Sequence, residues 1–344
     1  MFINKIINCL LLINIIFGLK INNYKPSFIN NKNNNLSKKD NLYNDLKKTS
    51  LLSKLIYEYN FVNDNNIKNN FTVIPDLNIP TNLTFDFIKR NNIYFNLVQF
   101  ITFLDNRRFI KSTDKYFNLL NVFFPNTQIY GYFCNKNRLY ALIIINRNLK
   151  EIIVAFRGSQ YIDEWCKNLY TDEKELVFNN KFKIHEGIYN MYSENNADNN
   201  LIYILKNLYE YYPKYRKIFT GHSRGSINSI LLSLELNTIL NEKYDYEIFS
   251  FGSPPIFNKK LGKYLHNHPK IKIYNIINNM DIVPLLPLYN KFHIGDEILL
   301  KDKNAIIKKH DNPYKFNNNI SIKNIGISIL QHDLNNYIDN IFNF

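Results

Sequence analysis

The chain has 344 residues, of which 45% are hydrophobic and 15% are aromatic. That is enough apolar material for a sizeable core, which excludes a largely disordered chain and leaves room for one large domain or two small ones. The net charge is +14, yet no long basic block with interleaved aromatic residues and no nucleic-acid-binding motif accompanies it, so we expect no nucleic-acid partner.

The N-terminus predicts a signal peptide. Residues 1–8 carry one lysine and no acid, and residues 9–19 are almost wholly apolar before charged sequence begins at Lys20. Such an apolar core is short for a bilayer span but has the length of a signal-peptide core. We therefore expect residues 1–20 to be a signal peptide and the protein to be secreted or to enter the secretory pathway. An uncleaved anchor and a buried helix are the alternatives.

Residues 21–96 form an Asn/Lys-rich N-terminal extension with weak periodicity. A helix is expected at residues 42–61, with apolar side chains along one side at Leu51, Leu52, Leu55, Ile56 and Tyr59. The composition fits a propeptide, a flexible extension or a part of the N-terminal helical packing, and we assign the region no function. Two more apolar helices are expected at residues 96–104 and 115–123.

Strands alternate with helices from residue 128 onward. Strands are expected at residues 128–133, 139–146, 151–156, 217–220, 247–251 and 271–277, and the second is a nearly continuous apolar run. Helices are expected at residues 187–212, from residue 224, at residues 259–266 and from about residue 329. This order predicts an α/β protein with a mostly parallel central sheet and helices on both faces.

A candidate nucleophile lies between one of these strands and the helix that follows it. Gly221-His222-Ser223-Arg224-Gly225 has the form G-x-S-x-G. A reactive serine needs a sharp strand-to-helix turn, and glycines two residues to either side remove side chains that would collide with the neighbouring strand and helix. The alternative is a serine that only caps an ordinary helix. Because the chain has only 10 glycines, the pattern favours a nucleophilic Ser223.

With this motif, the sequence resembles the class 3 (fungal-type) lipase family of α/β hydrolases over about residues 128–337. Four stretches carry the resemblance, and QHDLNNYI around His332 fits as a fifth. The four are IIVAFRGS ending at Ser159, GHSRGS around Ser223, FGSPPIFN from Phe251 and NNMDIVPLLP around Asp281. The resemblance implies the α/β-hydrolase fold for residues 97–344.

The resemblance also implies a catalytic triad of Ser223, Asp281 and His332. Asp281 follows a predicted strand, at the sheet edge where an acid must lie to orient a histidine. The chain order serine, acid, histidine is the order of this fold. His293, in a strand-like stretch, and His310, in a charged loop, are competing histidines downstream of Asp281. A solvent-exposed histidine at a helix start is the alternative for His332.

For the oxyanion hole, the family pattern implies the backbone N–H groups of Arg224 and Ser159. Members of the family usually have an apolar residue where this chain has Arg224, and a glycine where it has Ser226. The donor of Arg224 is a backbone group, so the hole survives the change. The arginine side chain leaves the substrate preference open.

Residues 160–170 resemble the lid of the family. Ile162, Trp165 and Leu169 would fall on one face of an amphipathic helix, with charged residues opposite. Such a lid covers the site in water and binds a lipid surface when open. A fixed surface helix is the alternative.

The leading hypothesis is hydrolysis of lipid carboxylic esters, triacylglycerol or partial glycerides, through an acyl-enzyme on Ser223. The partners would be a lipid ester substrate and a lipid–water interface or membrane surface. The chemistry needs no metal or cofactor, and no residue cluster has zinc-ligand spacing. Phospholipase A1-type or galactolipase activity is an alternative, because the positive charge suits anionic membranes. A catalytically silent lipid-binding protein is another.

Overall fold

The computed structural model describes residues 36–57, 122–124, 128–135, 138–158, 173–177, 179–186, 189, 192, 197–255, 257–279, 281–285, 294–301, 304–308 and 331–343. The expected signal peptide and the expected helix at residues 96–104 lie outside these ranges. Only residues 122 and 123 of the helix expected at residues 115–123 lie within them, and both are helical.

Within the described residues, the centre of the protein is a sheet of eight strands in the order β1-β2-β3-β6-β7-β8-β9-β10. Strands β3, β6, β7, β8 and β9 pair in parallel, and the remaining pairs at the two edges are antiparallel. The prediction of a mostly parallel central sheet is therefore confirmed. The bounds are β1 Gln128–Asn135, β2 Arg138–Asn146, β3 Glu151–Phe156, β6 Arg216–His222, β7 Tyr246–Phe251, β8 Ile271–Asn278, β9 Asp296–Lys301 and β10 Asn304–Lys308.

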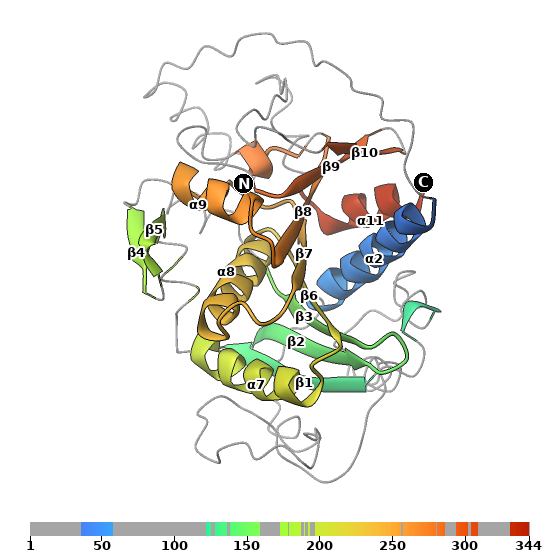
Figure 1. Ribbon diagram of the computed structural model, residues 1–344. Coiled ribbons are helices and arrows are strands. Elements are labelled where there is room, and N and C mark those ends of the chain that lie inside the picture. Colours follow the sequence, from blue (N-terminus) through green and yellow to red (C-terminus); the bar gives the residue numbers. More distant parts are fainter. Residues whose placement is uncertain are drawn as a thin grey trace, which may run out of the picture.

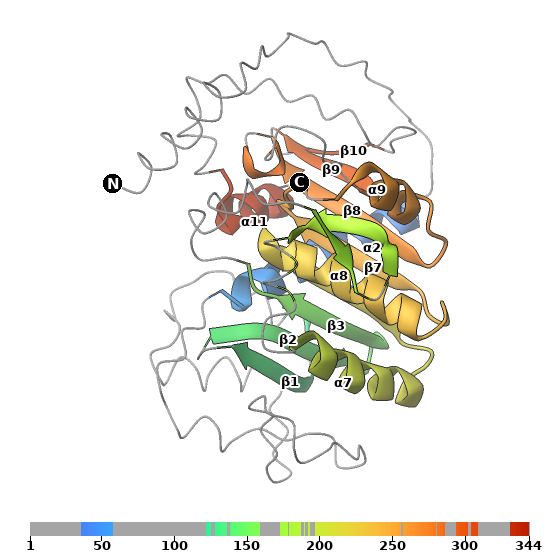
Figure 2. The ribbon, with the colours of Figure 1, turned by 90° about the vertical axis from the view of Figure 1, so that its left-hand side faces the viewer.

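Helices cover both faces of this sheet, as predicted (Figures 1 and 2). Helices α8 and α9 lie on one face, where α7 packs against α8. Helices α2 and α11 lie side by side on the other face. The bounds are α2 Leu36–Leu55, α7 Ala197–Tyr211, α8 Arg224–Ile239, α9 Lys259–His266 and α11 Leu334–Phe342. A short hairpin of β4 (Glu173–Leu176) and β5 (Asn179–His185) stands apart from the main sheet.

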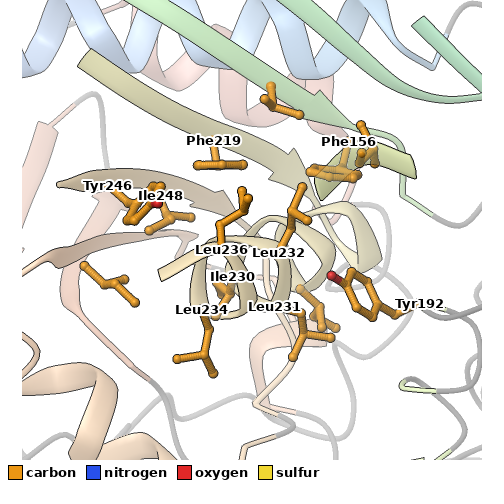
Figure 3. Close-up of a cluster of buried hydrophobic side chains, with 14 of the residues drawn as sticks. Phe156, Tyr192, Phe219, Ile230, Leu231, Leu232, Leu234, Leu236, Tyr246 and Ile248 are labelled. Carbon is orange, nitrogen blue, oxygen red and sulfur yellow. The ribbon is translucent and has the colours of Figure 1, made fainter. Parts of the chain in front are cut away.

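Helix α8 forms the centre of the larger apolar cluster. It is buried on nearly all sides, because it contacts the sheet on one side and α7 packs against another. The predicted inward positions Ile227, Ile230, Leu231 and Leu234 are fully buried. Figure 3 shows Leu232 and Leu236 of the same helix pointing toward Phe219 of β6. This packing fixes the start of α8, and with it the turn that carries Ser223.

Helix α2 belongs to the second apolar cluster, on the opposite face. Its C-terminal half buries Leu51, Leu52, Leu55 and Ile56, so the predicted apolar side is confirmed for those four residues. The helix ends at Leu55 rather than at residue 61, and Tyr59 lies outside the described residues. The N-terminal region could have been a propeptide, a flexible extension or part of the N-terminal helical packing, and residues 36–57 pack on the domain as a helix and the turn after it.

Ion pairs attach α2 to the sheet. The ammonium group of Lys48 donates to both carboxylate oxygens of Glu151 at 2.7 Å. Arg216 bonds Asp45 of α2 at 2.7 Å, Glu151 at 2.7 Å and Glu247 at 2.9 Å. The ammonium group of Lys48 also lies 2.9 Å from Asp45, so the two buried acids, Asp45 and Glu151, each pair with both cations. The proposed domain boundary at residue 97 stays a prediction.

Three features of the secondary structure differ from the sequence-based predictions. Helix α11 begins at Leu334 rather than near residue 329, because the Asp333 side chain accepts a hydrogen bond from Asn335 N at 2.8 Å and caps the helix. Strand β10 and the β4–β5 hairpin were not predicted. Across the described ranges, no helix has the length and apolar character needed to cross a membrane.

Candidate active site

Ser223 lies on the sharp turn between β6 and α8. Its backbone has φ 57° and ψ −125°, the left-handed region that side-chain-bearing residues rarely occupy. Its N–H donates to the Phe251 carbonyl of the neighbouring strand at 2.9 Å. The side chain is half-buried rather than enclosed. This is the strained strand-to-helix turn that the sequence pattern predicted.

The two glycines of the motif are required by close packing. A Cβ on Gly221 would overlap the backbone of Gly225 across the turn. A Cβ on Gly225 would overlap the Phe156 carbonyl at the end of β3. The first glycine therefore lets the turn close, and the second lets α8 start directly against the sheet.

Asp281 is fully buried after the end of β8. One carboxylate oxygen accepts from Val283 N at 2.9 Å. The other accepts from Nδ1 of His332 at 2.7 Å and from the Tyr337 hydroxyl. Burial of the Tyr337 phenol and the adjacent Asp281 carboxylate raise the pKa of Tyr337, which keeps the phenol a donor.

His332 is 5% exposed, so it is not the solvent-exposed histidine of the alternative reading. A carboxylate only accepts, so the Nδ1 nitrogen of His332 carries a hydrogen, and in the neutral imidazole Nε2 is then the acceptor. That Nε2 atom is buried and has no hydrogen-bond partner within the described residues. A histidine in this state can take a proton at Nε2, which is the task of a general base.

Asn278 holds the segment that carries this histidine. Its side-chain amide donates to the Gln331 carbonyl at 3.2 Å and to the Gln331 side chain at 3.1 Å. Asn340 of α11 donates to the Asn278 side-chain oxygen at 2.9 Å. Residues 53 or more positions apart in the chain thus place His332 against Asp281.

The residue before the nucleophile also contacts His332. The rings of His222 and His332 lie with their centroids 4.4 Å apart. Nδ1 of His222 lies 3.0 Å from the hydroxyl of Tyr57, two residues beyond the end of α2. Desolvation by burial and the nearby His332 lower the pKa of His222, so this second imidazole stays neutral.

One of the two predicted oxyanion donors lies among the described residues. Arg224 is the first residue of α8, where the helix itself offers its N–H no acceptor and its dipole favours negative charge. Ser159 lies outside the described residues, although Arg157 and Gly158 before it follow directly after β3. The predicted lid residues Ile162, Trp165 and Leu169, and the competing His293 and His310, also lie outside.

Two residues of this site were not predicted. Tyr337 lies within the QHDLNNYI stretch, five residues after His332, so the motif contained it without a signal for its role. Tyr57 belongs to the N-terminal region, which has no motif. In the described part of the chain, no group of three or more histidine, cysteine, aspartate or glutamate side chains could hold a metal ion.

Comparison with known proteins finds relatives over this region. Residues 153–291 match the family Lipase (class 3). A lipase of Rhizomucor miehei is 26% identical over 166 residues, which is 47% of this chain and 45% of that protein. Phospholipase A1-IIbeta of Arabidopsis thaliana is 24% identical over 194 residues, which is 48% of this chain and 47% of that protein. The chain thus spans about half the length of the curated relatives it matches.

The solved structures agree with the sheet described above. A deletion mutant of the Rhizomucor miehei lipase propeptide complex superposes with a TM-score of 0.53 at 22% identity, covering 62% of this chain and 68% of that one. At this identity the likeness shows the fold, which is that of the α/β hydrolases.

Proposed function

Since residues 153–291 belong to the class 3 lipase family, we propose that this protein hydrolyses carboxylic esters of lipids through an acyl-enzyme on Ser223. The observation that carries the proposal is the hydrogen bond of 2.7 Å between Nδ1 of His332 and Asp281, on a histidine whose ring packs on the residue before Ser223. The serine on its strained turn supplies the nucleophile, and the histidine supplies the base.

In the proposed reaction, Ser223 Oγ attacks the ester carbonyl carbon while Nε2 of His332 takes the hydroxyl proton. The carbonyl oxygen becomes an oxyanion, which accepts hydrogen bonds from the backbone N–H groups of Arg224 and Ser159. His332 then gives its proton to the leaving alcohol, and the acyl group stays on Ser223. A water molecule, deprotonated by Nε2 of His332, then attacks the acyl carbon. The bond from that carbon to Ser223 Oγ breaks, Oγ takes the proton back from His332, and the fatty acid leaves. Asp281 stabilises the imidazolium through its hydrogen bond to Nδ1.

Triacylglycerols and partial glycerides are the first substrates we propose, as the matched family and the Rhizomucor miehei relative suggest. Phospholipase A1-type activity is the second, because one relative carries that name and the charge of +14 suits anionic membranes. Initial rates of proton release by pH-stat separate the two. A higher rate on a tributyrin emulsion supports the first, and a higher rate on vesicles of anionic phospholipid supports the second.

The predicted signal peptide leads us to propose secretion as well. From the sequence alone, we also propose that the predicted lid contacts the lipid surface through Ile162, Trp165 and Leu169. Secretion is tested by expressing the full chain in a eukaryotic host and sequencing the N-terminus of protein recovered from the medium. Protein that stays in the cells with an intact Met1 would contradict it.

The catalytic roles are tested with a fluorescent alkyl fluorophosphonate, in detergent so that any lid is open. We expect wild type to be labelled, Ser223→Ala to lose all labelling, and His332→Ala to lose most of it because the serine is no longer deprotonated. Thermal unfolding of each variant shows that it is folded. Folded wild type that is not labelled would favour the silent lipid-binding alternative.

A further inference from the structure

We propose that Tyr57, two residues beyond the end of α2, is a positioning residue of the active site. It holds the ends of β3 and β6 together and fixes the His222 ring against His332. The inference rests on the proposed function, because it concerns the same histidine. It assigns a role in the site to a part of the chain that carries no motif of the family.

The first observation is the contact between Tyr57 and His222. The hydroxyl lies 3.0 Å from Nδ1 of the imidazole and 3.4 Å from the backbone carbonyl of the same residue. The two rings meet edge to face, with centroids 5.7 Å apart. One phenol thus constrains both the ring and the main chain of the residue that precedes the nucleophile.

The second observation is how closely β3 approaches the same phenol. A Cβ on Gly158, two residues beyond the end of β3, would overlap both the Tyr57 hydroxyl and the His222 carbonyl. The three groups therefore meet at one point, where only glycine fits. Gly158 directly precedes Ser159 and His222 directly precedes Ser223.

The third observation is that α2 contacts β6 at several points along its length, which fixes the position of the Tyr57 hydroxyl. Asp45 of α2 forms an ion pair with Arg216, the first residue of β6. Further along the helix, the Ser53 hydroxyl lies 3.0 Å from that of Thr220, in the middle of β6. Tyr57 then reaches His222, the last residue of β6. The helix therefore follows this one strand from its beginning to the elbow.

The consequence for catalysis comes from the close packing of the two imidazole rings, whose planes are tilted by 35°. During the reaction His332 becomes positively charged, and a second charged imidazole 4.4 Å away would oppose that step. Burial lowers the pKa of His222 and keeps it neutral. Burial also raises the pKa of Tyr57, only partly opposed by Arg224 and Arg157, so the phenol stays protonated. A neutral His222 held by a neutral phenol gives His332 a fixed, uncharged neighbour.

The test is Tyr57→Phe, which keeps the ring and removes the hydroxyl. Its matched control is Tyr244→Phe, which also removes one buried tyrosine hydroxyl, bonded to the Tyr209 carbonyl at 3.2 Å, at the opposite end of the sheet. Steady-state kinetics on p-nitrophenyl butyrate give kcat and KM, and thermal unfolding gives stability. We expect Tyr57→Phe to lower kcat roughly tenfold with KM within about twofold, since misplacing a catalytic group affects the chemical step most. The control keeps wild-type kcat.

A double-mutant cycle of Tyr57→Phe with His222→Asn tests whether Tyr57 affects catalysis through His222. If Tyr57 acts through His222, the two losses in kcat are shared and the double variant is no worse than the more affected single one. A kcat of Tyr57→Phe within twofold of wild type would overturn the inference, and so would losses that simply multiply. If Tyr57→Phe does not fold, His222→Asn alone decides, because unchanged kcat there also overturns it. Wild type that neither turns over the ester nor reacts with a fluorophosphonate defeats the proposed function instead.

Discussion

Replacing Asp281 by asparagine tests the geometry of the site most sharply, because the side chain keeps its size and changes one atom. Three donors face the carboxylate: Val283 N on one oxygen, and Nδ1 of His332 together with the Tyr337 hydroxyl on the other. An amide presents one acceptor and one donor. Either its NH2 group faces the Val283 N–H, or it faces the two donors on the other side.

Both arrangements disturb His332. If the amide NH2 points toward the imidazole, Nδ1 must become an acceptor and the hydrogen moves to Nε2, the nitrogen that should take the Ser223 proton. If it points toward Val283, a donor meets a donor and the carbonyl oxygen carries no full negative charge to stabilise the imidazolium. We expect the rate at which Ser223 reacts to fall by about 10⁴-fold, the size of effect on kcat known for a wrong tautomer in a serine triad.

The assay is the second-order rate of labelling by an alkyl fluorophosphonate, with thermal unfolding to show that the variant is folded. Asp245→Asn is the matched control, because Asp245 is an exposed acid paired with Lys270 at 3.1 Å, away from the site. Its labelling rate should equal that of wild type. A folded Asp281→Asn variant that is labelled within tenfold of wild type would refute the assignment of Asp281 as the acid that orients His332.

Three further predictions concern packing and charge. Gly225→Ala places a Cβ against the Phe156 carbonyl, so labelling of Ser223 should be lost and the melting temperature should fall, whereas Ser233→Ala on the same helix should keep its labelling. Glu151→Gln leaves the buried Lys48 without its main partner, so the free energy of unfolding should fall by about 3 kcal/mol in denaturant titration. A loss below about 1 kcal/mol would show that Asp45, whose carboxylate lies 2.9 Å from the Lys48 ammonium group, is a sufficient partner. Burial lowers the pKa of Lys217 to about 8, below the unfolded value, so the unfolded state binds more protons between pH 8 and about 10.5. The stability of wild type relative to Lys217→Met should therefore rise with pH across that window, and a flat difference would contradict the shift.

The elbow is the part of the site that the sequence predicted best. Its serine and two glycines lie within five consecutive residues, and the strand and helix on either side follow directly in the sequence. All of these features are local, so a sequence pattern can contain them. The strand boundaries were predicted to within about two residues for the central strands, because strands buried on both faces are continuous apolar runs. The start of α11 was misplaced, since the cap on Asp333 competes with the apolar residues before it.

The sequence by itself predicted the α/β alternation and the strained turn at Ser223, because apolar periodicity and the glycines of the turn are features of neighbouring residues. Asp281 and His332 were predicted from the resemblance to the class 3 lipases. Only the tertiary structure decided which groups surround them. The Asp281–His332 bond joins residues 51 positions apart, and the Tyr57–His222 contact joins residues 165 positions apart. Such contacts depend on how α2 and α11 pack on one face of the sheet, and that packing comes from shape, burial and ion pairs summed over many residues, which no local pattern records.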